Sequence, residues 1–199
     1  MYNSVVYLLA VAYLLNSCAP AVIGATAATG LVLSQEKTVG KTVDDATIWT
    51  RIKSNFLHKN FDHMFIGVDV KVDEGRVLLT GYVPDVKTRM EAVKIVWSQE
   101  GVKEVMDEIQ ISSKNDKLTL KEYSLDTWIT TQLKTKLLVE KNIRSVNYNI
   151  ETIEGIIYLL GIAQNKEELD KVTYLASTIP NVKKVMSFVR LKDSPLRNK

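Results

Sequence analysis

The chain of 199 residues contains two copies of one module, and this internal repeat limits the possible fold more than any other feature. The segment DATIWTRIK at residues 45–53 returns as DTWITTQLK at 126–134, a shift of 81. The segment DEGRVLLTG at 73–81 returns as IEGIIYLLG at 153–161, a shift of 80. We therefore expect two domains of the same fold.

Each copy predicts the order helix, strand, strand, helix, strand. Apolar residues four apart give the first helix of each copy one buried face: Ile48, Ile52 and Phe56 in the first copy, and Ile129, Leu133 and Leu137 in the second. We expect Asp45 and Asp126 to cap these helices at their N-termini. Second helices are expected at 86–99 and 165–178, and last strands at 102–111 and 182–191. The predicted class is α+β, with two tandem αββαβ domains, each a three-stranded mixed sheet carrying two helices on one face.

Four glycines have expected structural roles. Gly75 and Gly155 are expected in the tight turn between the first two strands, where glycine tolerates a positive φ. Gly81 and Gly161 lie in the return strands, where the missing side chain allows another backbone segment to come close.

The N-terminus predicts secretion and lipidation. Residues 5–15 are uncharged, too short for the roughly 20 residues of a spanning helix, and typical of a signal sequence. The following LNSC at 15–18 is similar to a bacterial lipobox, which predicts a lipidated Cys18 as the mature N-terminus. Ala19 is not the aspartate that retains such proteins at the inner membrane, so we expect the outer membrane. An ordinary signal, or an anchor with an incidental cysteine, is the alternative.

The predicted division of the chain is a signal peptide at 1–17, a lipidated flexible tether at 18–39, domains at 40–111 and 117–192 joined by a linker at 112–116, and a disordered tail at 193–199. Residues 40–111 carry a net charge of −2 and residues 117–199 carry +5. The second domain should therefore be attracted to anionic surfaces.

The two copies resemble the BON domain over about 150 residues. The resemblance rests on the strand glycines, Gly81 and Gly161, and on a downstream Gly-Val-x-x-Val, GVKEV at 101–105. In the second copy Asn181 replaces this glycine, and asparagine also tolerates left-handed backbone. The order of lipobox, flexible tether and two BON-like copies along the chain is similar to that of dual-BON outer-membrane lipoproteins. It implies binding of anionic phospholipid by the second domain, with a role in envelope integrity and at division sites.

The residues indicate no enzyme, cofactor, nucleic-acid partner or small-molecule substrate. His58 and His63, in a predicted loop, lack the Cys/His cluster of a metal site. The candidate lipid-binding surface is the side of helix 126–139 that faces away from the core, and consists of Trp128, Thr131, Lys134, Thr135, Leu138 and Val139. An exposed indole near lysine suits a lipid headgroup layer. Packing of Trp128 between the domains, or no role, are the alternatives.

The leading functional hypothesis is a lipid-anchored, non-enzymatic adaptor at the outer membrane. Its second domain would bind anionic phospholipid, and its first domain would face a protein partner such as the outer-membrane assembly machinery. The alternative is a periplasmic protein-binding scaffold or stress chaperone.

Overall fold

The computed structural model describes residues 39–112 and 120–198. The first domain contains α3 (Val39–Lys59), a π-helical turn η1 (Phe61–Phe65), β1 (Val68–Asp73), β2 (Arg76–Val83), α4 (Val86–Trp97) and β3 (Glu104–Ile111). The second contains α5 (Leu120–Val139), a 3-10 turn η2 (Ser145–Asn147), β4 (Tyr148–Ile153), β5 (Ile156–Ala163), α6 (Lys166–Ser177) and β6 (Lys184–Leu191). The predicted αββαβ order is confirmed in both copies. The predicted signal peptide, Cys18 and nearly all of the tether and linker lie outside the described residues.

Each domain forms a three-stranded mixed sheet. The central strand, β2 or β5, pairs antiparallel with the preceding strand and parallel with the last one. The register is the same in both domains, since Val68 pairs with Gly81 and Tyr148 pairs with Gly161. The predicted core residues of α3 and α5 are all buried against one face of their sheet.

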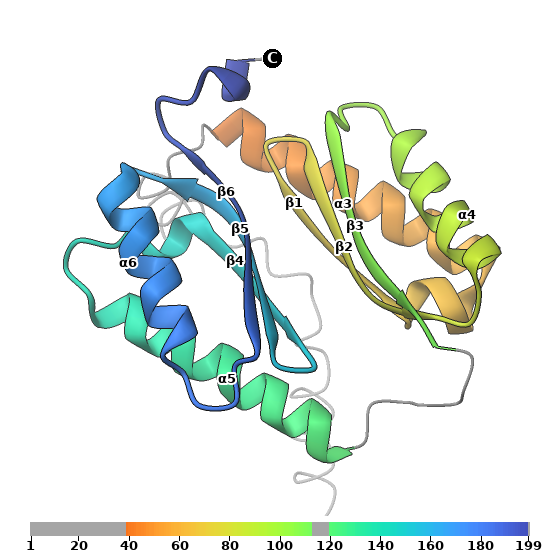
Figure 1. The fold of residues 1–199 in the computed structure, drawn as a ribbon. Coiled ribbons are helices and arrows are strands. Elements are labelled where there is room, and N and C mark those ends of the chain that lie inside the picture. The colour runs from red at the N-terminus through yellow and green to blue at the C-terminus, as the bar shows by residue number, and fades with distance from the viewer. Residues whose placement is uncertain (1–38, 113–119, 199) are drawn as a thin grey trace, which may run out of the picture.

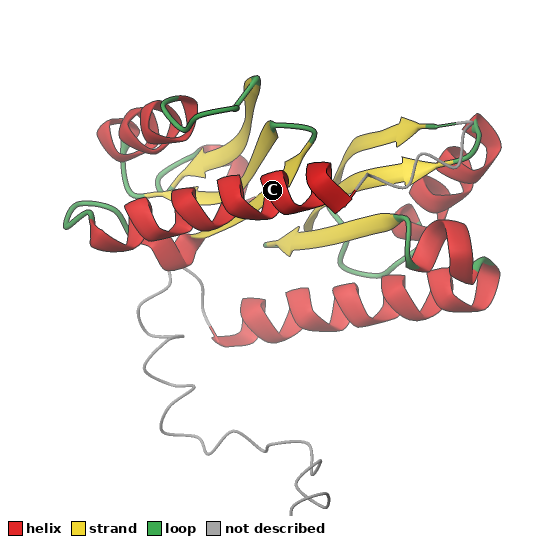
Figure 2. Ribbon diagram, turned by 90° about the horizontal axis from the view of Figure 1, so that it is seen from below, coloured by secondary structure: helices red, strands yellow, loops and turns green. Residues whose placement is uncertain are grey.

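The other faces of the two sheets pack against each other. The residues buried between them come from both domains: Leu78 and Met106 from the first, and Ile153, Tyr158 and Leu160 from the second. The molecule therefore has four layers, with two sheets inside and a pair of helices on each outer face (Figures 1 and 2). A sheet covered on both faces explains why residues on both sides of β2 and β5 are buried.

The prediction that Asp45 and Asp126 cap helices is wrong. Both helices begin earlier, at Val39 and Leu120, so each aspartate lies inside its helix. The two oxygens of Asp126 instead accept hydrogen bonds from the backbone N–H groups of Glu154 and Gly155, at 2.7 and 2.8 Å. Asp45 accepts the equivalent bonds from Glu74 and Gly75, so each aspartate joins the first helix to the β-turn.

The strand glycines lie where two backbone segments meet. A Cβ added to Gly81 would lie 2.2 Å from the carbonyl oxygen of Gly67, and one added to Gly161 would lie 2.0 Å from that of Asn147. No side chain fits at such distances. Gly75 and Gly155 have φ values of 78° and 76° in their turns, and Asn181 has a φ of 68°.

Two further expectations are corrected. The C-terminal segment is ordered through residue 198 and ends in a 3-10 turn, η3 (Pro195–Asn198), because Arg197 is bound to the first domain. His58 lies in the last turn of α3 and His63 lies in η1, so neither histidine is in a loop.

Candidate functional site

The outward side of α5 exposes all six residues of the predicted lipid-binding surface. Ile129, Leu133 and Leu137 face the core, which turns the opposite side of the helix to solvent. Trp128 is 42% exposed, and Leu138 and Val139 are 73% and 72% exposed at the C-terminal end of the helix. Thr131, Lys134 and Thr135 are also exposed. The helix thus presents a large aromatic group, two aliphatic groups and a lysine to solvent.

A row of threonines makes this side less polar than its sequence suggests. The hydroxyls of Thr127, Thr131 and Thr135 each donate to the carbonyl oxygen four residues earlier, at 2.9, 2.8 and 2.9 Å. Because these donors are already satisfied within the helix, removing water from the row costs less than removing it from free hydroxyls. Thr127 was not among the predicted residues, although its spacing of four from Thr131 could have identified it.

One edge of this surface borders a cleft between the two domains. The cleft has a volume of about 930 Å³. Tyr123, Thr131 and Lys134 of α5 line it on one side, and His63 and Ile66 line it on the other. Thr131 and Lys134 therefore lie at the edge of the predicted surface that borders the cleft, whereas Trp128 does not line it.

A charged cluster lies in the wall of the cleft. Lys71 Nζ contacts Asp69 of its own strand at 2.7 Å and Glu151 of the second domain at 3.1 Å. Burial and the neighbouring Asp69 raise the pKa of Glu151, although Lys71 opposes this shift. Both carboxylates form ion pairs with Lys71, so the cluster links the two domains.

The domain arrangement is held by two further ionic groups. Arg76 of β2 donates to Glu104 at 2.9 Å and to the carbonyl oxygen of Phe188 in the second domain at 2.7 Å. Arg190 of β6 reaches the same Glu104 at 2.6 Å. Arg197 bonds both oxygens of Glu74, at 2.9 and 2.8 Å. These bonds link the edges of the apolar interface between the sheets.

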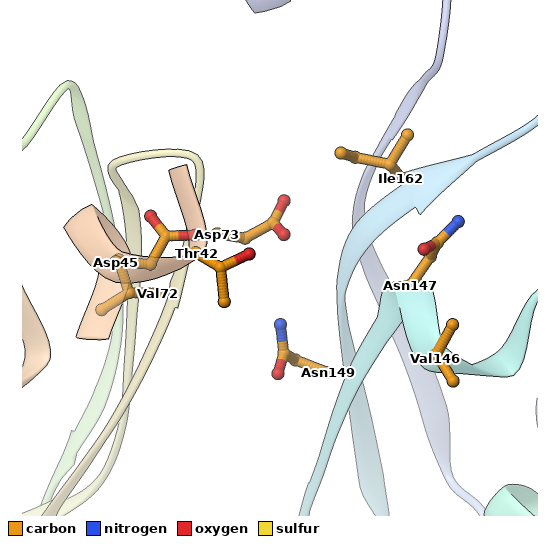
Figure 3. Close-up of a pocket in the computed structure, with 8 residues that line it drawn as sticks. All are labelled: Thr42, Asp45, Val72, Asp73, Val146, Asn147, Asn149 and Ile162. Atoms are coloured by element: carbon orange, nitrogen blue, oxygen red, sulfur yellow. The ribbon is translucent and has the colours of Figure 1, made fainter. Parts of the chain in front are cut away.

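A smaller pocket between the domains offers little room for a ligand. Its volume is about 160 Å³, below the range of about 300–1,000 Å³ usual for small-molecule sites. Asp73 from the first domain and Asn149 from the second point into the gap (Figure 3).

Within residues 39–112 and 120–198, no group of three metal-ligating side chains lies together. The helices in this part of the chain include none long and apolar enough to span a bilayer.

Comparison with known families settles the kind of domain. The model of the BON domain matches residues 44–113 and 125–193, which include both sheets and most of the four helices. The chain is a BON-domain protein. Its two BON domains share the strand glycines described above, whose geometry explains why a larger residue cannot occupy those positions.

Curated relatives align with most of the chain. A protein of Anaplasma centrale, described as an uncharacterized protein in the gshII 5' region, is 42% identical over 78% of this chain and 99% of its own length. The outer membrane lipoprotein DolP of Haemophilus influenzae is 30% identical over 94% of each chain. The osmotically-inducible protein Y of Escherichia coli is 29% identical over 77% of this chain and 76% of its own.

Proposed function

We propose that this chain is a non-enzymatic lipoprotein of the outer membrane whose second BON domain binds anionic phospholipid. Cys18 would hold it in the periplasmic leaflet, and the protein would support envelope integrity, with localisation to division sites. The observation that carries the lipid proposal is the outward side of α5, where Trp128, Leu138 and Val139 are exposed together and Lys134 lies at the edge.

The chemistry of this side fits a headgroup layer. Indole partitions to the boundary between apolar and polar regions, and a lysine near an anionic surface contributes about 1 kcal/mol. Lys134 makes no ion pair with any other described residue, so its charge is available to a phosphate. Because the hydroxyls of the threonine row already donate hydrogen bonds within the helix, contact with lipid would leave none of these donors without a partner.

The sheet interface favours this proposal over a role for Trp128 in joining the domains. The apolar residues between the domains belong to the strands β2 to β6. Trp128, by contrast, lies on the outward side of α5. The relationship to an outer membrane lipoprotein supports the proposed location.

Sedimentation with lipid vesicles tests the proposal. Residues 19–199, without the anchor, should bind phosphatidylglycerol vesicles and not phosphatidylcholine vesicles. Trp128→Ala should weaken binding about tenfold, equivalent to about 1.4 kcal/mol, and leave thermal stability nearly unchanged. Thr47→Ala, at the equivalent position of α3, is the matched control and should bind as the wild type does.

Two results would reject the lipid proposal. One is equal binding to both kinds of vesicle. The other is a large loss of stability in Trp128→Ala with unchanged binding, which would make Trp128 a structural residue. Binding to unfolded envelope proteins in place of vesicles would favour the scaffold or chaperone alternative.

A further inference from the structure

The second helices of the two BON domains differ on their outward sides, although their folds are equivalent. In α4 the side facing away from the core exposes Val86, Met90 and Trp97, which are 57%, 66% and 52% exposed. Residues 0, 4 and 11 positions along a helix share one side, and the buried residues Thr88, Ala92 and Val96 occupy the other. The exposed residues therefore form one apolar strip, here called the α4 strip.

The internal repeat provides a control for this strip within the same molecule. At a shift of 80, the three positions in α6 are Lys166, Asp170 and Ser177. Lys166 and Asp170 form an exposed ion pair at 2.7 Å. The fold therefore does not require apolar residues at these positions, and the α4 strip needs an explanation other than folding.

The charged residues at the border of the α4 strip indicate which kind of partner would cover it. Lys87 and Lys94 are exposed at its border and form no ion pair within 4 Å of any other described residue, although the charge of Lys87 interacts with that of Asp85, just before the helix. The nearby acidic residue of α4, Glu91, is 3.8 Å from Lys59 of α3. An occupant with carboxylates beside its own apolar residues would complement these lysines.

Two other occupants fit less well. In a symmetric dimer the same patch meets itself, so the unpaired lysines of one copy would face those of the other. The membrane proposed above would contact α5, and α4 belongs to the opposite outer layer of the molecule (Figure 1). One flat bilayer in contact with the outward side of α5 would leave the α4 strip exposed.

We propose that the α4 strip is a docking surface for a protein segment with an apolar face bordered by carboxylates, in its simplest form an acidic amphipathic helix. Docking would bury Met90 and Trp97 at the centre, where apolar and aromatic contacts contribute most to affinity. Lys87 and Lys94 would pair with acidic residues at the border. The first domain would then bind protein on the side of the molecule opposite the proposed lipid surface.

Two labelled helical peptides with the same leucine face test this proposal by fluorescence anisotropy. One peptide carries glutamate beside the leucines, and the other carries lysine. The wild-type chain should bind the glutamate peptide at least about tenfold more tightly than the lysine peptide. Replacing the strip with its α6 counterparts, Val86→Lys, Met90→Asp and Trp97→Ser, should abolish this binding and preserve the circular dichroism spectrum.

Two further variants test the role of charge and provide a control on α6. Lys87→Glu with Lys94→Glu should reverse the peptide preference, and Asp170→Ala on α6 should change nothing. Equal binding of both peptides, or full binding by the α6-like variant, would overturn the proposal. Loss of phosphatidylglycerol binding in the α6-like variant would instead assign the strip to a membrane, and loss of a wild-type dimer would assign it to self-association.

Discussion

The carboxylate of Asp126, inside α5, accepts a hydrogen bond of 2.8 Å from the backbone N–H of Gly155 in the turn between β4 and β5. Its second oxygen accepts from Glu154, and Asp45 makes the same pair of bonds in the first domain. One side chain thus satisfies two donors of a turn that is distant in sequence. This contact fixes the hairpin against the first helix in both BON domains.

Asp126→Ala should destabilise the second domain by about 2 kcal/mol or more, because two turn donors, the buried one of Gly155 and the partly buried one of Glu154, would lose their acceptor. The urea midpoint of unfolding measures this loss. Glu140→Ala, farther along the chain and outside the turn, is the control and should lie near the wild type. An unchanged midpoint in Asp126→Ala would show that water replaces the carboxylate without cost.

Gly161→Ala should prevent normal folding of the second domain or cost about 3 kcal/mol or more. The new Cβ would meet the carbonyl oxygen of Asn147 at 2.0 Å. Gly161 is paired with Tyr148, the residue that follows Asn147, so the strand pairing holds the two backbone segments at this distance. The yield of folded protein and the urea midpoint test this. Gly40→Ala, at an exposed position in α3, should be neutral or slightly stabilising. Wild-type stability in Gly161→Ala would contradict the close approach.

The contact between Glu74 and Arg197 should make stability depend on pH. Burial opposes ionisation of Glu74, but hydrogen bonds from Arg197 and Lys41 outweigh it and lower the pKa to about 2. The depressed pKa stabilises the folded state above the unfolded pKa of about 4.5, and this contribution is lost as the pH falls towards 2.

Glu74→Gln should therefore be less stable than the wild type by about 1–3 kcal/mol at pH 7. The difference should shrink between pH 4.5 and pH 2, as measured by urea unfolding across that range. A difference that stays constant with pH would mean that the carboxylate charge contributes nothing.

Lys134→Glu should weaken binding to phosphatidylglycerol vesicles by about 1 kcal/mol or more, because the charge near the anionic surface is reversed. Raising the salt concentration should reduce this difference, since screening acts on the charge and spares the indole of Trp128. Lys103→Glu, an exposed lysine of the first domain, changes the net charge equally and should have little effect. Equal losses in both variants would indicate attraction by net charge alone.

Cys18→Ser should abolish lipidation, because serine lacks the thiol that carries the acyl group. Labelling with radioactive palmitate and the mass of the mature protein measure the change. The variant should retain an unprocessed or wrongly processed signal. A variant that keeps the acyl label and the mass of the lipidated wild type would refute the lipobox interpretation.

Local patterns were enough to predict much of this fold. The spacing of Ile129, Leu133 and Leu137 identified the buried side of α5. The internal repeat then predicted the same elements at the equivalent positions of both domains. The same spacing identified the exposed side that carries Trp128. These features follow from backbone periodicity and side-chain polarity, which act over a few residues and are readable along the chain.

The contacts between distant segments were decided only by the tertiary structure. An aspartate before an apolar helix could equally cap that helix or bind a remote turn, and only the packing of α5 on its sheet brings Asp126 to Gly155. The burial of Leu78 against the second sheet and the binding of Arg197 to Glu74 likewise depend on how the two domains meet. The sequence alone determined the elements and their buried sides, because these are local properties. The partners of each buried charge required the three-dimensional arrangement, because no sequence spacing encodes a contact between segments that are far apart in the chain.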